Sequence, residues 1–128
     1  MTTVDMSGQV LTDLRFDYSV VLSFTGGYVV LVASPFMLNT PGAAHDFTPD
    51  LDPPEGLAPM NNLLGQRIFA TEIGANGSLS MTFDDGSRLC VPPDANYEAW
   101  NLSGPGGLFV VCMPGGALET WSGIAPER

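Results

Sequence analysis

Asp84 and Asp85 stand side by side in the segment FDDGS, and adjacent carboxylates can hold a metal ion or activate a water molecule. The glycine that follows, Gly86, allows a different role. A three-residue hairpin loop commonly ends in a glycine in the left-handed region, and aspartate suits its early positions because it bonds nearby amides. The pair is therefore either a chemical site or a turn between two strands.

A partial internal repeat favours the turn. Residues 8–32 align with residues 65–91 when the second copy is allowed two extra residues, and both copies begin with Gly-Gln. The equivalent loop of the first copy is Thr-Gly-Gly, without a carboxylate, so the two loops share only their final glycine. We predict equivalent hairpins with Gly27 and Gly86 at positive φ, and no metal at the aspartates. The matched apolar residues are Val20, Leu22, Phe24, Val30 and Val32 in one copy and Leu79, Met81, Phe83, Leu89 and Val91 in the other.

The remaining reactive residue types form no catalytic or metal-binding pattern. The single histidine, His45, has no nucleophile placed beside it by the sequence. Asp50-Leu51-Asp52 is similar to the start of a calcium loop, but the sixth position is Glu55 instead of glycine and the twelfth is Asn61 instead of glutamate. The two cysteines lie outside any C-x-x-C spacing. We predict no catalytic residue, no metal and no cofactor, so the protein is not expected to be an enzyme.

One carboxylate keeps an alternative open. In a strand over residues 97–102, Glu98 would share a face with Trp100, and a carboxylate beside a tryptophan can have a raised pKa. Together with Trp121 these residues would line a pocket for a small ligand or a substrate. The structural alternatives are an ion pair of Glu98 with Arg67 or Arg88, and a position at the edge of the sheet.

Composition limits the partners. The net charge is −10, and the only cations are four arginines, so phosphate backbones and anionic membranes are repelled while a basic protein partner is attracted. Acidity that serves solubility alone, or genome coding bias, is the other explanation. No apolar run approaches the roughly 20 residues that span a bilayer, and the first residues do not form a secretory signal. We expect a cytoplasmic protein with free thiols.

Alternating apolar residues and glycine-rich turns predict a single all-β domain over residues 1–128. We expect two related three-stranded meanders and a C-terminal hairpin, curled into a sandwich or open barrel, with one short helix near residues 57–64. The second face of the first hairpin carries Val21, Val29 and Leu31, and we expect it to be covered inside the domain or in a dimer. The same face of the second hairpin should be exposed to solvent. The expected strands are 9–16, 18–24, 28–33, 66–73, 78–83, 87–91, 97–102, 108–113 and 117–121.

The proline-rich, acidic connection 40–59 is the candidate partner-binding segment. It is longer than ordinary loops and contains four acids and no cation. Phe47 and Leu51 would be apolar anchors among Asp50, Asp52 and Glu55, which would form a charged rim. The alternative is a passive linker between the two copies.

The segment from Leu64 to Trp121 resembles a family of small bacterial proteins of unknown function. The resemblance is carried by GSLSMTFDDGSRLCVPPDANYEAWNLSGPGG and by the closing PGGALETW. A looser likeness in size and charge exists to small acidic immunity proteins, which neutralise toxins between competing bacteria. We therefore expect a non-catalytic binding protein, most concretely an immunity-type inhibitor of a basic toxin. The alternatives are a small-ligand binder or enzyme, and a structural homodimer.

Overall fold

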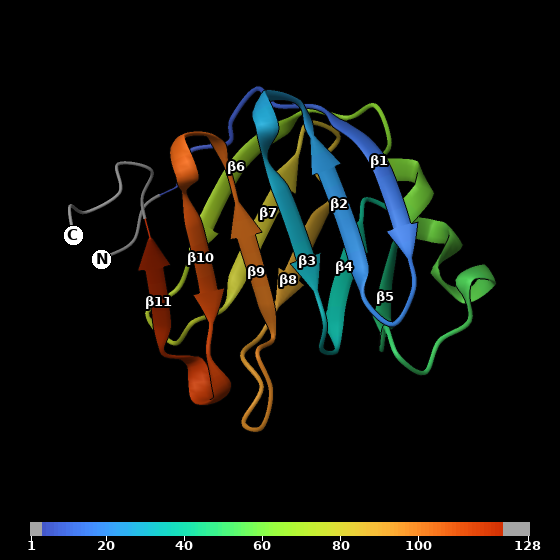
Figure 1. Cartoon of the computed structure of the whole chain (residues 1–128). Coiled ribbons are helices and arrows are strands. Elements are labelled where there is room, and N and C mark those ends of the chain that lie inside the picture. The colour runs from blue at the N-terminus through green and yellow to red at the C-terminus, as the bar shows by residue number, and fades with distance from the viewer. Residues whose placement is uncertain (1–3, 122–128) are drawn as a thin grey trace.

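The computed structural model describes residues 4–121, which form two antiparallel β-sheets packed face to face (Figure 1). The first sheet has the strand order β1-β2-β3-β9-β10-β11, and the second has the order β5-β4-β8-β7-β6. The prediction of an all-β sandwich is therefore confirmed. The strands are β1 (Leu11–Phe16), β2 (Val20–Phe24), β3 (Val29–Val32), β4 (Phe36–Thr40), β5 (Ala43–Phe47), β6 (Ile68–Ile73), β7 (Leu79–Phe83), β8 (Arg88–Val91), β9 (Trp100–Ser103), β10 (Phe109–Cys112) and β11 (Leu118–Trp121).

The core lies between the sheets and is built from the alternating residues of the two repeat copies. In β2 and β7 every second residue is buried, and the register pairs Leu22 with Val30 in one sheet and Met81 with Leu89 in the other. The ten matched apolar residues of the two copies are all buried, as the repeat predicted. Burying this apolar surface from water is the main favourable term that holds the sandwich together.

The two copies meet along a short crossing of their Gly-Gln segments. Gly8 donates a backbone hydrogen bond to Ile68 (2.8 Å), and Gly65 donates the equivalent bond to Leu11 (2.8 Å). The return bonds run from Ile68 to Gln9 (2.8 Å) and from Leu11 to Gln66 (3.0 Å). Because each bond has a counterpart in the other copy, the crossing has approximate two-fold symmetry.

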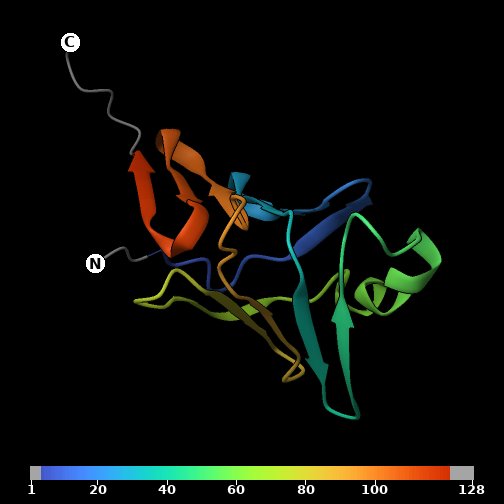
Figure 2. The ribbon, with the colours of Figure 1, turned by 90° about the horizontal axis from the view of Figure 1, so that it is seen from below.

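Each copy continues with two strands that join the other copy's sheet. After β3 the chain crosses over, and β4 pairs with β8; after β8 it crosses back, and β9 pairs with β3. Figure 2 shows the two layers and the β4–β5 hairpin, which projects beyond the neighbouring strands. The repeated unit is therefore five strands long, with an exchanged pair in each sheet, and β11 is added at the end.

The structure corrects two expectations about the segment before the second copy. Residues 40–59 are not one long loop, because β5 occupies Ala43–Phe47 and a run of 3₁₀ turns begins at Pro54. That helical run extends to Leu63, so the expected short helix exists but begins earlier, and it buries Leu57, Met60 and Leu63. β9 begins at Trp100, so Glu98 precedes the strand instead of lying in it.

Candidate functional site

The Asp84-Asp85 pair forms a turn. Gly27 has φ +87° and Gly86 has φ +91°, so both hairpins close on a left-handed glycine as predicted. The two turns differ at the position before this glycine. The first copy has another left-handed glycine there, Gly26, whereas the second copy has Asp85. No group of three or more histidine, cysteine, aspartate or glutamate residues that could hold a metal occurs within residues 4–121.

Asp85 connects this turn to the start of its own copy. Its carboxylate accepts hydrogen bonds from the backbone N–H of Ser87 (2.8 Å) and from Nε2 of Gln66 (2.9 Å). Partial burial raises the pKa of Asp85, but the hydrogen bonds from Ser87 and Gln66 together outweigh it and leave that pKa below its usual value. In the first copy Gln9 plays the equivalent part by accepting a bond from the hydroxyl of Thr25 (2.6 Å). The Gly-Gln signature therefore braces each hairpin loop.

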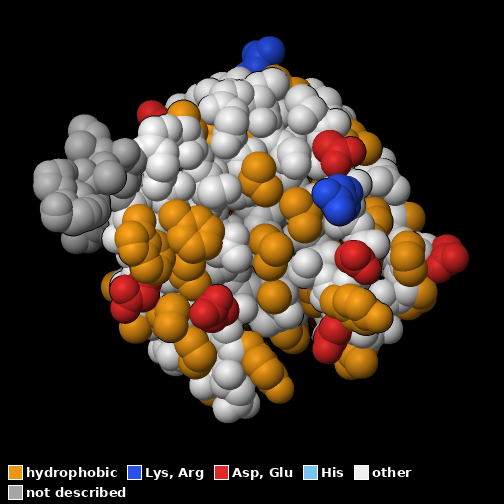
Figure 3. Space-filling model, in the orientation of Figure 1, with side chains coloured by type: hydrophobic (Ala, Val, Ile, Leu, Met, Phe, Trp, Pro, Cys, Tyr) orange, Lys and Arg blue, Asp and Glu red, His pale blue; other side chains and the backbone are white. Residues whose placement is uncertain are grey.

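An open groove of about 600 Å³ is lined by residues of both candidate sites. Its lining brings together the carboxylates Asp50 and Glu98, which the sequence had placed in two separate candidate sites. Tyr97, which directly precedes Glu98 in the sequence, also lines the groove and is 68% exposed. In Figure 3 acidic side chains stand among hydrophobic ones along the lower part of the molecule. The lining residues are Ala33, Asp50, Asn96, Tyr97, Glu98 and Pro114.

Hydrogen bonds fix both loops that form the groove. On one side, the Asp52 carboxylate accepts from the backbone N–H of Thr48 (2.7 Å), while the Thr48 carbonyl accepts from Leu51 (3.0 Å). On the other side, the Asp94 carboxylate accepts from the N–H groups of Asn96 (2.8 Å) and Tyr97 (3.2 Å). A loop that is already ordered loses less conformational entropy when a partner binds.

The structure divides the predicted partner-binding residues. Phe47 is buried at 5% exposure and packs against Phe36, with ring centroids 5.3 Å apart, so it cannot anchor a partner at the surface. Leu51, in contrast, is 78% exposed. Asp52 is half-buried and holds its own loop, whereas Glu55 is exposed in the first turn of the helical run.

The alternative pocket of Glu98, Trp100 and Trp121 is not assembled. Trp100 is fully buried in the core, where its indole Nε1–H donates to the carbonyl oxygen of Gly77 (2.9 Å). Trp121 lies on β11 with 51% of its surface exposed, and its ring packs at a tilt of 38° against Phe109. The hydrophobic alternation that would have put Glu98 beside Trp100 fails because the strand begins only at Trp100.

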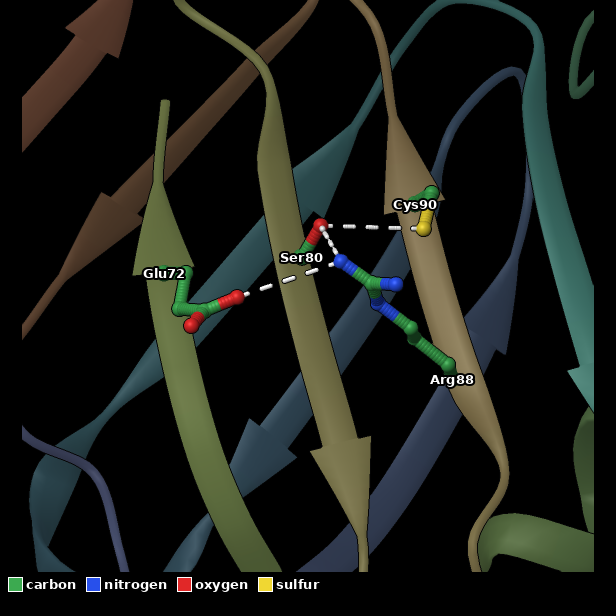
Figure 4. A network of polar contacts seen from close by, with 4 residues as sticks. All are labelled: Glu72, Ser80, Arg88 and Cys90. Carbon is green, nitrogen blue, oxygen red and sulfur yellow. Dashed lines mark hydrogen bonds and ion pairs between the residues drawn. The ribbon is translucent and has the colours of Figure 1, made fainter. Parts of the chain in front are cut away.

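A polar network of four side chains lies on the outer face of the second sheet (Figure 4). Arg88 lies 3.8 Å from the Glu72 carboxylate and donates to the hydroxyl of Ser80 (3.4 Å), which lies 3.6 Å from the sulfur of Cys90. The ion pair joins side chains that are 51% and 72% exposed, and such pairs add little stability. The prediction that this face is exposed to solvent is confirmed. The carboxylate that pairs with Arg88 is that of Glu72 instead of Glu98.

The two thiols should differ strongly in reactivity. Burial raises the pKa of the Cys112 thiol, and its side chain is inaccessible. Titration of the native protein with Ellman's reagent should therefore modify Cys90 at least about 100-fold faster than Cys112, which reacts only after unfolding. Cys90→Ser should abolish the fast phase, and equal rates for both thiols would contradict the packing around β10.

Comparison with known proteins gives a family and no activity. In residues 4–121 no helix is long and apolar enough to cross a membrane. A search of curated proteins found no match, and a search of solved structures found none. One family model, described as a family of unknown function (DUF6188), matches residues 2–122, nearly the whole chain and more than the segment that carried the resemblance. The chain therefore belongs to this family of unknown function, DUF6188.

Proposed function

We propose that the protein is a non-catalytic binding protein whose partner is a basic protein, most concretely a basic toxin that it inhibits. The observation that supports this proposal is the groove that Asp50, Glu98 and the exposed Tyr97 line together. Among residues 4–121, no arginine lines the groove beside its two carboxylates.

This lining suits a lysine or arginine side chain of the partner. Carboxylates form charge-assisted hydrogen bonds with guanidinium and ammonium groups, and the face of a tyrosine ring attracts a cation. Tyrosine and arginine are also the residue types most enriched where binding energy concentrates in interfaces. Leu51, on the neighbouring loop, replaces Phe47 as the apolar anchor because it is the exposed one of the two.

The whole chain supports the same kind of partner. With a net charge of −10, it attracts a basic protein from a distance and raises the association rate. Small size and acidity are shared with immunity proteins, which motivates a toxin as the partner. A cytoplasmic location remains part of this proposal.

The test is isolation of the partner followed by a charge-matched comparison. The protein is used as bait in lysate of the native host, and the captured protein is identified by mass spectrometry and purified. We then expect the double variant Asp50→Asn, Glu98→Gln to weaken binding about 100-fold, because two charge contacts are lost. Tyr97→Ala should weaken it about tenfold or more. Calorimetry at low and high salt measures both effects.

The control removes the same charge elsewhere. Asp17 and Asp84 are exposed acids outside the groove, and Asp17→Asn with Asp84→Asn changes the net charge equally. This variant should lower the association rate slightly and leave the dissociation rate unchanged. If both double variants bind alike, charge acts only at long range and the groove is not the binding site.

A further inference from the structure

A second hollow, of about 190 Å³, lies at the start of β4 and the end of β5, and we call it the side hollow. The buried rings of Phe36 and Phe47 form its floor, and Met37 at its rim is 41% exposed. Asp46 and Thr48 are the polar residues in a lining that is otherwise apolar. The lining residues are Pro35, Phe36, Met37, Asp46, Phe47, Thr48 and Pro92.

The groove and the side hollow are neighbours, because three connections of the chain line both of them. The connection from β3 to β4 gives Ala33 to the groove and Pro35 to the side hollow. Asp50 and Thr48, after β5, divide in the same way, as do two residues of the connection from β8 to β9. Figure 2 is viewed from the end of the sandwich at which these connections lie. Residues two apart in a chain are separated by at most about 7 Å, so one short segment of a partner can reach both spaces.

The carboxylates of both spaces are unpaired in the described part of the chain. Within residues 4–121, no hydrogen bond or ion pair holds the carboxylate of Asp46, Asp50 or Glu98. Arg88, which shares the outer face of the second sheet with Asp46, extends the other way, across β7 towards Glu72 on β6. A carboxylate at the rim of an apolar hollow suits a long basic side chain. Its aliphatic stem covers the apolar lining while its charged head reaches the carboxylate.

We infer that the side hollow binds a second basic side chain from the same partner segment that places an arginine or lysine in the groove. This inference rests on the function proposed above and specifies the segment that is recognised. In an extended segment, side chains two residues apart point to the same side and lie about 7 Å from each other, whereas adjacent side chains point to opposite sides. The recognised segment is therefore extended and has two basic residues separated by one other residue.

The experiment compares two peptides of equal charge that differ only in the spacing of their arginines. Both have five residues and blocked ends. The spaced peptide is Gly-Arg-Gly-Arg-Gly, and the adjacent peptide is Gly-Arg-Arg-Gly-Gly. NMR titration of the isotope-labelled whole chain measures the dissociation constant of each peptide. We expect the spaced peptide to bind about tenfold more tightly, because both of its arginines meet a carboxylate at the same time.

Substitutions in the side hollow should remove this preference. Asp46→Asn should weaken binding of the spaced peptide about tenfold and leave binding of the adjacent peptide nearly unchanged. Met37→Ser should weaken binding of the spaced peptide about threefold, because the aliphatic stem loses an apolar contact. Asp84→Asn is the matched control, because it removes the same charge from an exposed acid at the other end of β8 and should leave the preference intact. Asp46 and Met37 are exposed, and circular dichroism checks that each variant is folded.

Three results would overturn the inference: no binding of either peptide, equal affinity for the two peptides, or a preference that Asp46→Asn leaves unchanged. The groove variant Asp50→Asn, Glu98→Gln shows whether the proposed function falls with it. If this variant weakens binding of both peptides while Asp46→Asn has no effect, the groove still binds basic side chains and only the side hollow is excluded. If the groove variant also binds both peptides as the wild type does, the arginines bind elsewhere and both proposals fail.

Discussion

Gly116→Ala is expected to lower the free energy of unfolding by about 3–5 kcal/mol, because it combines backbone strain with overlap of atoms. Gly116 has φ +101°, and a Cβ atom there would overlap the carbonyl oxygen of Asn76. The same added atom would lie 3.2 Å from the carbonyl carbon of Asn76 and 3.4 Å from Pro93. Neither the turn after β10 nor the turn before β7 can move freely, since each closes a hairpin.

The neighbouring glycine separates the two causes. Gly115 has φ +87°, but a Cβ atom there would meet nothing within 4 Å. Gly115→Ala should therefore cost only about 1–2 kcal/mol, which is the penalty of the left-handed conformation alone. Urea denaturation of the wild type and both variants measures the difference. Equal losses for the two variants would mean that the two turns do not touch in solution.

Trp100→Phe is expected to cost about 2–4 kcal/mol, although the side chain remains aromatic. Trp100 is fully buried, and its indole N–H satisfies the carbonyl oxygen of Gly77. Phenylalanine would leave that oxygen without this donor and would leave part of the indole volume empty. Because Gly77 belongs to the second sheet's β6–β7 turn and Trp100 to β9, the substitution loosens the contact between the sheets.

Trp121→Phe is the matched control for this prediction. Trp121 is half-exposed on β11, and a phenylalanine keeps an aromatic ring against Phe109, so the loss should stay below about 0.5 kcal/mol. Urea denaturation compares the two variants. A Trp100→Phe protein as stable as Trp121→Phe would show that the hydrogen bond to Gly77 adds nothing.

The sequence predicted the parts of the fold that depend on local pattern. Alternation and glycine-ended loops identified both meanders and the final hairpin, and the matched Gly-Gln starts identified the repeat. β4 and β5 were missed for a physical reason. β5 reads Ala-Ala-His-Asp-Phe, which has low strand propensity, and its pairing with β4 fixes the conformation, with Phe36 opposite Phe47. That pairing also explains why Phe47 is buried while Leu51 is exposed.

The candidate site was only half predictable. Both Asp50 and Glu98 were singled out, but nothing local indicates that they line one groove. Their proximity results from the exchanged strands, because residues 48–52 follow β5 of one sheet and residues 96–98 precede β9 of the other. Tyr97 was missed as a site residue, and its position between Asn96 and Glu98 in a loop was the signal that could have identified it.

The exchange of strands also has a consequence for synthesis of the chain on the ribosome. When β1, β2 and β3 have emerged, the edge of β3 lacks β9, and their apolar inner face lacks the second sheet. β4 and β5 must likewise wait for β8. Such partners, distant in sequence, make folding slow and leave unpaired strand edges exposed meanwhile. The nascent chain therefore stays open to proteases and to aggregation until almost all of it has been made.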